Sequence, residues 1–330
     1  MERPLASDFR VLAKLITKIE NDRFGSEDIL RNLYKENSET IVIGITGPPG
    51  AGKSSLTDRI IKEYRNLSKT VGVVAVDPSS PFTGGAILGD RIRMCDHATD
   101  PGVFIRSMGS RGSLGGLAPA TIDVLNLMKS AGFDVLIVET VGVGQSEIDV
   151  MSIADTVLLV LVPGMGDDVQ ALKAGIMEIA DIFVINKADK DGKERLAAEL
   201  NMIINLNRHR LEWEPPVVET VATENKGTVE LMEKIRDRGM WLKNKGVLAK
   251  KDKIINQFKQ MALDRIGANI LAILNEQGMF TRWSGDLMNG KTNPYQAMKE
   301  LDEMIKIEWG KKRQERSITS VSQSTTFRIL

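Results

Sequence analysis

The stretch IVIGITGPPGAGKS, residues 41–54, runs from an apolar β-branched segment into a glycine-rich loop that ends in Lys53 and Ser54. The loop has the spacing of a glycine, four residues and then Gly-Lys-Ser, which is typical of phosphate-binding loops. Its glycines let backbone N–H groups turn inward around a phosphate, and the amino end of a following helix adds positive potential. We therefore expect a strand, a phosphate-binding loop and a helix in this order.

Each position of the loop has a predicted part in nucleotide binding. Lys53 would neutralise the β- and γ-phosphates, and the Ser54 hydroxyl would ligate Mg²⁺. Because a predicted strand and a predicted helix flank the loop, we prefer this interpretation to an ordinary glycine-rich turn. The predicted contacts from this loop to the nucleotide are Gly47, Pro48, Pro49, Gly50, Ala51, Gly52, Lys53, Ser54 and Ser55.

Short β-branched runs alternate with helical stretches from residue 41 onward, a pattern typical of a parallel sheet covered by helices. The runs are apolar almost throughout, as expected for strands that are buried on both faces. We predict an α/β fold, a P-loop NTPase with a mostly parallel central sheet. The expected strands are 41–46, 71–76, 103–106, 135–139, 156–162, 182–186 and 217–221, and the expected helices between them are 53–66, 120–131, 169–179 and 193–207.

The chain of 330 residues is long enough for about two domains, and its pattern divides it into three parts. Residues 1–40 are an expected N-terminal helical extension, because apolar and charged residues recur there at helical spacing. Residues 41–225 are the predicted P-loop domain. Residues 226–330 are a predicted C-terminal helical segment, with helices at 229–243, 253–276 and 294–309 and a flexible tail rich in serine and threonine.

The charge balance and the cysteine content exclude several classes of protein. Lysine and arginine (44) equal aspartate and glutamate (44), so no overall positive field draws the chain to nucleic acid or to an anionic membrane. No apolar run approaches the roughly 18 residues that a membrane helix needs. The one cysteine, Cys95, cannot form an internal disulfide or a thiolate metal cage. We expect a cytoplasmic protein without a nucleic-acid or membrane partner.

The segment Asn-Lys-Ala-Asp, residues 186–189, predicts which base is bound, because it directly follows a predicted strand. A carboxylate at Asp189 can accept hydrogen bonds from the ring N–H and the exocyclic amine of guanine, whereas adenine offers no such pair of donors. Lys187 would lie along the base, and Asn186 would tie this loop to the phosphate loop. At the next strand end, the backbone N–H of Ala222 would donate to the guanine oxygen. We therefore expect GTP and GDP as the bound nucleotides.

Acidic residues at the ends of predicted strands indicate a magnesium site. Asp77 closes the second expected strand and Glu139 the fourth, and both ends would lie at the edge of the sheet that carries the phosphate loop. Gly142 follows in an acidic-x-x-Gly element, where its N–H would sense the γ-phosphate. Asp90 lies in a glycine-flanked loop and is a candidate for metal binding or for orienting water, with a plain surface acid as the alternative.

Four blocks of sequence, taken together, resemble one known family. They are VAVDPSSPFTGGAILGDRIRM (74–94), FIRSMGSRGSLGGLA (104–118), VETVGVGQSE (138–147) and INKAD (185–189). They are similar to the methylmalonyl-CoA mutase-associated GTPases of the MeaB/ArgK type, densely so over residues 40–225. The resemblance implies a GTPase that acts as a chaperone for adenosylcobalamin-dependent methylmalonyl-CoA mutase and couples GTP hydrolysis to cofactor delivery and protection.

The resemblance also implies site residues and an assembly. Asp77, Asp90 and Glu139 match the magnesium positions of the family. Residues 163–173 match its extra switch, in which Gln170 and Lys173 respond to the partner; the alternative is an ordinary strand-to-helix connection with a solvated lysine. A homodimer built by the C-terminal helices is implied, although the apolar residues there fit internal packing equally well. The predicted catalytic set is Lys53, Asp90, Glu139, Gln170 and Lys173.

Other functions stay open beside this one. A metallochaperone GTPase that delivers nickel shares the nucleotide chemistry, but it needs a Cys/His cluster, whereas this chain has only Cys95, His97 and His209. A regulatory module that binds GTP for another partner and a small-molecule kinase are further alternatives. Turnover separates them, because a silent module is not accelerated by any partner and a kinase transfers phosphate to an acceptor instead of water.

Overall fold

The computed structural model describes residues 8–22, 24–33, 39–77, 97, 99–109, 120–140, 153–164 and 180–306. Internal contacts divide the chain into two compact units, Met1–Phe258 and Lys259–Leu330. The first unit holds the phosphate loop and the base-recognition segment predicted from the sequence. The domain boundaries predicted after residues 40 and 225 remain predictions.

A seven-stranded sheet organises the first unit, and its strands run parallel in the order β3-β2-β4-β1-β5-β6-β7. The predicted fold class is confirmed. β3 continues three residues past its expected end, because Ser107 to Gly109 pair with Ala75 to Asp77 of β2. The expected helix 169–179 lies outside the described residues. The strands are β1 (Ile41–Thr46), β2 (Val71–Asp77), β3 (Val103–Gly109), β4 (Val135–Thr140), β5 (Thr156–Leu161), β6 (Ile182–Asn186) and β7 (Val217–Thr220).

The central strand of the sheet is β1, which lies between β4 and β5. The chain passes over β4 to go from β1 to β2, and it passes over β1 to go from β4 to β5. Because all the strands are parallel, the segments that follow β1, β4 and β6 leave the sheet at the same edge. Ligands of open parallel sheets bind at this edge, near the point where the strand order reverses.

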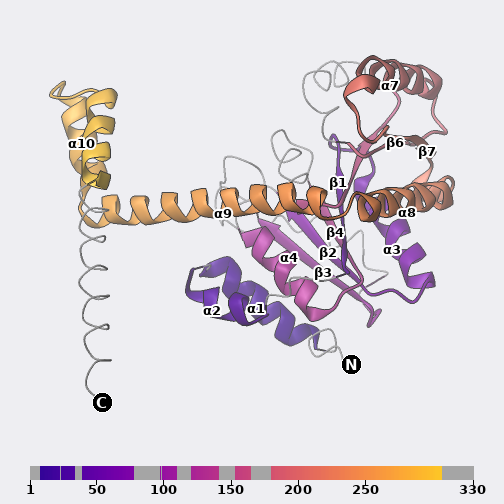
Figure 1. Cartoon of the computed structure of the whole chain (residues 1–330), viewed down its shortest axis with the longest axis horizontal. Helices are drawn as coiled ribbons and strands as arrows, with labels where there is room; N and C mark the ends of the chain where they lie inside the picture. The colour runs from indigo at the N-terminus through magenta and orange to yellow at the C-terminus, as the bar shows by residue number, and fades with distance from the viewer. Residues whose placement is uncertain are drawn as a thin grey trace. The chain divides into compact units, whose positions relative to one another are not determined.

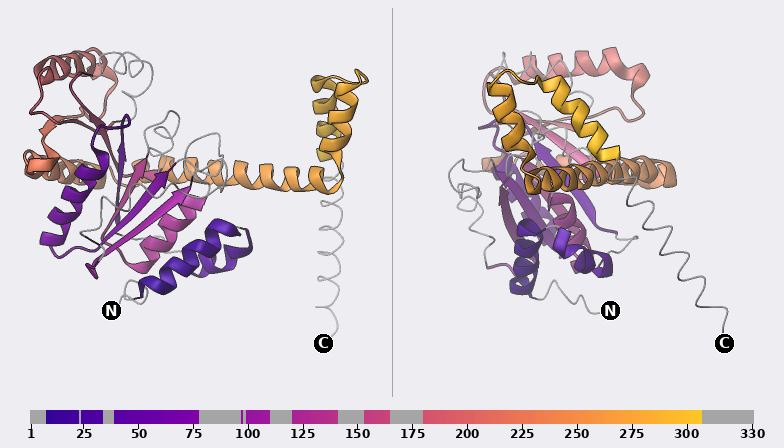
Figure 2. Two further views of the ribbon diagram at one scale, coloured as in Figure 1. Left: turned by 180° about the vertical axis from the view of Figure 1, so that it is seen from behind. Right: turned by 90° about the vertical axis from the view of Figure 1, so that its left-hand side faces the viewer.

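Helices cover both faces of the sheet (Figures 1 and 2). Strand residues alternate between the faces: Val42 packs in the cluster with α1 and α4, while Ile43 and Ile45 pack in the cluster with α3 and α8. Strands buried on both faces explain the continuous apolar runs of the sequence. One face carries α1 (Phe9–Asn21), α2 (Glu27–Leu33), α4 (Ala120–Ala131) and α7 (Lys193–Asn207), and the other carries α3 (Lys53–Asn66) and α8 (Thr228–Lys245).

The N-terminal helix α1 is part of the core of the first unit. Asp8 caps it, since its carboxylate accepts hydrogen bonds from the N–H groups of Arg10 and Val11 at 2.9 and 3.2 Å. Its apolar stripe lies against α4, and Phe9 packs at a tilt of 55° against Phe104 and stacks on Phe133, with ring centroids 5.2 and 6.2 Å away. The fully buried residues of the stripe are Leu12, Ile16 and Ile19.

The second unit is helical and has a small core of its own. Helix α9 (Val247–Glu276) enters it, α10 (Met279–Met288) follows, and residues 294–306 form another helix. Helix α10 was not predicted from the sequence, although Met279 and Trp283 stand four residues apart, as residues on one helical face do. Both are buried with Leu274 and Ala297. Within the described residues, none of the helices combines the length and the apolar character needed to cross a membrane.

Replacing Ile16 with alanine should lower the free energy of unfolding of the first unit by about 2–4 kcal/mol, because a fully buried side chain leaves a cavity. Urea denaturation followed by circular dichroism measures the loss. Val11 is the matched control, since it lies on the solvent side of α1 with 41% of its surface exposed. If Ile16→Ala costs no more than Val11→Ala, α1 is not part of the cooperative core.

Candidate nucleotide-binding site

The loop between β1 and α3 has a backbone that only glycine fits at two points. Gly47 has a φ of 140°, and a Cβ atom there would lie 2.1 Å from the carbonyl oxygen of Val160. Gly52 has a φ of 88°, and its Cβ would lie 2.3 Å from Nδ2 of Asn186. The backbone of the loop therefore lies close against β5 and against the last residue of β6, where only glycine leaves enough room. The loop therefore has a fixed shape, with Gly52 leading directly into the amino end of α3.

Lys53 is buried at the start of α3, with 7% of its surface exposed. Its ammonium group donates hydrogen bonds to the carbonyl oxygens of Gly47 at 2.7 Å and Pro48 at 3.1 Å. The loop thus closes around a positive charge that it holds at its centre. A phosphate group bound in the loop would meet this cation and the N–H groups of the first turn of α3.

A buried carboxylate lies next to the phosphate loop at the end of β4. Glu139 has 3% of its surface exposed, and its two oxygens accept hydrogen bonds from the hydroxyls of Ser54 at 2.6 Å and Thr57 at 2.8 Å. An ionised group at this depth needs such partners to offset lost hydration. Serine hydroxyl and carboxylate oxygens are the hard ligands that Mg²⁺ takes, so these residues fit the metal.

Of the remaining predicted metal and switch residues, the structure describes only the backbone of Asp77. Asp77 is the last residue of β2, two positions beyond the level of Glu139 on the neighbouring β4, and its side chain is outside the described part. Among the described residues, no three His, Cys, Asp or Glu side chains gather closely enough to hold a metal by themselves. The residues that lie outside the described ranges are Asp90, Gly142, Gln170 and Lys173.

Asn186, at the end of β6, joins the phosphate loop to the segment after β7. Its Nδ2 donates to the carbonyl of Ala51 at 2.9 Å. Its Oδ1 accepts hydrogen bonds from the hydroxyl of Thr220 and the backbone N–H of Ala222, both at 3.2 Å. The next residue, Lys187, has a φ of 57° and donates from Nζ to the carbonyl of Gly50 at 2.8 Å. The two segments predicted to bind phosphate and base are therefore in direct contact.

Asp189 is exposed at the tip of this loop, where a base would reach it. The loop is held below it, because the N–H of Ala188 donates to the carbonyl of Thr220 at 3.0 Å. A nearby cation, Lys226, was not indicated by any sequence pattern. A hydrogen bond to Glu224, with a smaller attraction from Asp189, raises the pKa of the Lys226 ammonium group above its ordinary value. Lys226 therefore stays charged at neutral pH.

Two further contacts of α3 were not predicted from the sequence. Thr57 shares Glu139 with Ser54, and its position one helical turn after Lys53 was the available signal. Arg59, two residues later, donates to the carbonyls of Ala222 and Thr223 after β7. No sequence pattern indicates that partner, because it lies more than 160 residues away in the chain.

The fold and the site define a P-loop nucleoside triphosphatase. The sheet is all parallel, a glycine-bounded phosphate loop follows its central strand, a buried lysine lies in that loop, and a carboxylate lies beside it. The family model described as methylmalonyl Co-A mutase-associated GTPase MeaB matches residues 12–274. The chain belongs to this family and is a GTPase, as the four sequence blocks had indicated.

Known relatives cover most of the chain. A putative GTPase of Pyrococcus abyssi is 51% identical over 90% of this chain and 93% of its own length. The GTPase ArgK of Escherichia coli is 35% identical over 86% of this chain and 88% of its own length. A crystal structure of a LAO/AO transport system kinase aligns with a TM-score of 0.66 at 27% identity, over 92% of this chain and 96% of that one. These relatives agree with the fold described above.

Replacing Lys53 with alanine should weaken GTP binding by a factor of about 100 or more, because the charge-assisted contacts to phosphate are lost. Titration with a fluorescent GTP analogue measures the change. Lys187→Ala is the matched comparison, since Lys187 also contacts the loop but is predicted to lie along the base. It should weaken GTP less than Lys53→Ala does. Equal effects, or retained GTP binding in Lys53→Ala, would mean that the phosphate loop is misassigned.

Proposed function

We propose that this GTPase serves adenosylcobalamin-dependent methylmalonyl-CoA mutase as a chaperone, coupling GTP hydrolysis to delivery and protection of the mutase cofactor. The observation that carries the proposal is the match of residues 12–274 to the mutase-associated family. A mouse relative named methylmalonic aciduria type A homolog, mitochondrial, supports it at 37% identity over 74% of this chain and 59% of its own length. The domains, residues 1–40, 41–225 and 226–330, would act together in this role.

In this proposal the chain's own groups bind and orient GTP. Lys53 and the N–H groups at the start of α3 hold the β- and γ-phosphates, and Gly142 senses the γ-phosphate. Ser54 ligates Mg²⁺, and the carboxylates that complete or support its shell are Asp77, Asp90 and Glu139. Bound Mg²⁺ supplies neutralisation of the charge on the β- and γ-phosphates. Burial of Glu139 against two hydroxyls keeps its carboxylate directed at this site.

Selectivity for guanine is assigned to the loops after β6 and β7. Asp189 accepts from the ring N–H and the exocyclic amine, and Ala222 donates its N–H to the guanine oxygen. Lys187 lies along the base. The contact of Asn186 with the N–H of Ala222 supports this arrangement, because it joins the end of β6, three residues before Asp189, to the segment after β7.

Replacing Asp189 with asparagine should weaken GTP binding and shift the preference toward xanthosine triphosphate, whose ring carbonyl pairs with the new amide. One hydrogen bond lost or gained changes affinity by about tenfold each way. Competition titration of GTP, xanthosine triphosphate and ATP measures the preference. Asp191→Asn, two residues further on and outside the predicted base contacts, is the control. If the parent protein binds ATP and GTP equally, the assignment of Asp189 is wrong.

Coupling to the mutase is assigned to residues 163–173. The segment follows β5 directly, and Gly164 has a φ of 91° with open space where a side chain would be. In this proposal the segment changes its course when the mutase binds. Gln170 and Lys173, three residues apart, would lie on one face of a helix and present a cation to the transferring phosphoryl group.

Adding the mutase should stimulate GTP hydrolysis by up to about 10³–10⁵-fold, by analogy with a cation supplied to the transition state. Lys173→Ala should abolish this stimulation and leave GTP affinity nearly unchanged. Phosphate release, measured with and without the mutase, tests both claims. Stimulation of Lys173→Ala equal to the parent's would show that this segment is not the coupling element, and no stimulation of either protein would contradict the proposed partner.

The assembly and the location in the cell belong to the same proposal. We assign a homodimer to the C-terminal helices, since α9 exposes several large apolar side chains, with Phe258 at 71% and Leu263 at 65% of their surface. Exposed apolar area of this kind commonly marks a contact between proteins. A cytoplasmic location is consistent with the single cysteine of the sequence.

A further inference from the structure

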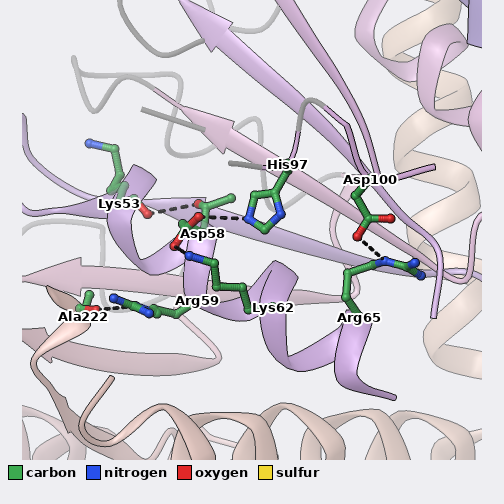
Figure 3. A network of polar contacts seen from close by, with 9 residues as sticks. Lys53, Asp58, Arg59, Lys62, Arg65, His97, Asp100 and Ala222 are labelled. Carbon is green, nitrogen blue, oxygen red and sulfur yellow. Dashed lines mark hydrogen bonds and ion pairs between the residues drawn. The ribbon is translucent and has the colours of Figure 1, made fainter. Parts of the chain in front are cut away.

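Arg59 links the helix after the phosphate loop to the turn after β7. Its Nε donates to the carbonyl oxygen of Ala222 at 2.7 Å, and its Nη2 donates to that of Thr223 at 3.1 Å. In Figure 3 the side chain leaves α3 toward Ala222, whereas Arg65, further along the same helix, points to Asp100. The guanidinium group thus binds the carbonyl oxygens of two successive residues in one short turn.

This turn, Ala222–Glu224, begins with a buried residue, whereas Thr223 and Glu224 are exposed. Ala222 has 3% of its surface exposed and packs in the same cluster as Leu56 and Ile60 of α3. An antiparallel bridge between Val221 and Lys226 closes the base of the turn. The carbonyl of Ala222 also accepts a hydrogen bond from the N–H of Asn225, but at 3.4 Å. Arg59 therefore makes the shorter contact to this carbonyl.

The backbone of Ala222 is held from both sides. Its N–H meets Oδ1 of Asn186 at 3.2 Å, and its carbonyl meets Arg59. The peptide planes on both sides of the residue are therefore tied down, and the Ala222 N–H lies on the side of Asn186 Oδ1, at the long distance of a weak hydrogen bond. The two ties come from different elements, β6 and α3, and the tie from α3 begins six residues after Lys53.

We propose that Arg59 is a positioning residue for guanine recognition: by holding the Ala222 carbonyl, it keeps the Ala222 N–H where the 6-oxo group of the base shares it with Asn186 Oδ1 in a three-centre hydrogen bond. The inference rests on the proposed contact between Ala222 and guanine. An arginine suits this task because its rigid, planar fork carries a permanent charge and presents two N–H groups to two carbonyl oxygens. Base selectivity then depends on a residue of the phosphate-loop helix that does not itself touch the nucleotide.

Three diphosphates separate the contacts to the base. Inosine diphosphate lacks the exocyclic amine that Asp189 would accept from, but it keeps the 6-oxo group. 6-Thioguanosine diphosphate keeps the amine and the ring N–H, but it replaces the 6-oxo group with sulfur, a weaker acceptor. Binding of GDP and of both analogues is measured by calorimetry for the parent, Arg59→Met and the control Arg65→Met. Arg65 is a suitable control because it makes equivalent contacts elsewhere, to Asp100 at 2.8 Å and to the carbonyl of Lys69 at 2.7 Å.

The parent and Arg65→Met should bind GDP about tenfold more tightly than 6-thioguanosine diphosphate, roughly one hydrogen bond's worth of affinity. In Arg59→Met this ratio should fall close to one, while the ratio of GDP to inosine diphosphate stays as in the parent. If Arg59→Met does not fold, Arg59→Lys takes its place, because the lysine ammonium keeps the positive charge without the planar pair of N–H donors. In Arg59→Lys the affinity ratio of GDP to 6-thioguanosine diphosphate should also fall.

Two results would count against these assignments in different ways. The inference is overturned, and the guanine site left intact, if an Arg59 variant keeps the parent's preference for GDP over 6-thioguanosine diphosphate. The same holds if the parent itself binds these two diphosphates equally but still prefers GDP to inosine diphosphate. A parent that does not prefer GDP to inosine diphosphate overturns the proposed guanine site itself.

Discussion

The carboxylate of Glu139 is buried at the end of β4, and the geometry of the site depends on the protein groups that offset its lost hydration. Water is largely excluded from it, so its charge must be met by protein groups. Ser54 and Thr57, in the first two turns of α3, supply two hydroxyls. Since β4 is a neighbour of β1, this contact fixes the start of α3 against the strand beside the one it follows. The phosphate loop is thereby closed at its helical end, while Gly47 closes it at its strand end.

Helix α3 carries this constraint to other parts of the first unit. Beyond Thr57, Asp58 contacts the buried His97 at 2.9 Å, and Arg65 binds Asp100 at 2.8 Å, so two contacts hold the segment before β3 (Figure 3). Arg59 points instead to the turn after β7. The Arg65 guanidinium also holds the pKa of the Asp100 carboxyl below its ordinary value, which keeps that ion pair formed at neutral pH. One helix therefore positions the predicted phosphate contacts, the predicted base contacts and the segment that enters β3 at the opposite edge of the sheet.

Most of the fold could be predicted from local sequence patterns. The apolar runs predicted each strand, because burial on both faces leaves few polar residues in them, and the family followed from four blocks such as residues 185–189. The sequence also placed Glu139 and Asn186 at strand ends, where the structure brings both against the phosphate loop. It could not predict the contact between Arg59 and Ala222, since a side chain that binds backbone carbonyls places no requirement on the residue type of its partner. Helix α10 was missed because it is short and begins directly after Gly278, close to the end of α9.

The order of the strands also governs when the protein can fold. β1 comes first in the chain, but its partners in the sheet are β4 and β5, so Ile41 pairs with Val135 and Ile43 with Thr156. During synthesis the central strand and its phosphate loop must wait, unpaired, until those later strands have left the ribosome. Helix α1 waits as well, because α4 provides its packing surface. Contacts between residues so distant in sequence slow folding, and an exposed apolar strand invites aggregation in the meantime. The strand at the centre of the nucleotide site is therefore the first of the seven to be made, but it completes its pairing only after β5 has been synthesised.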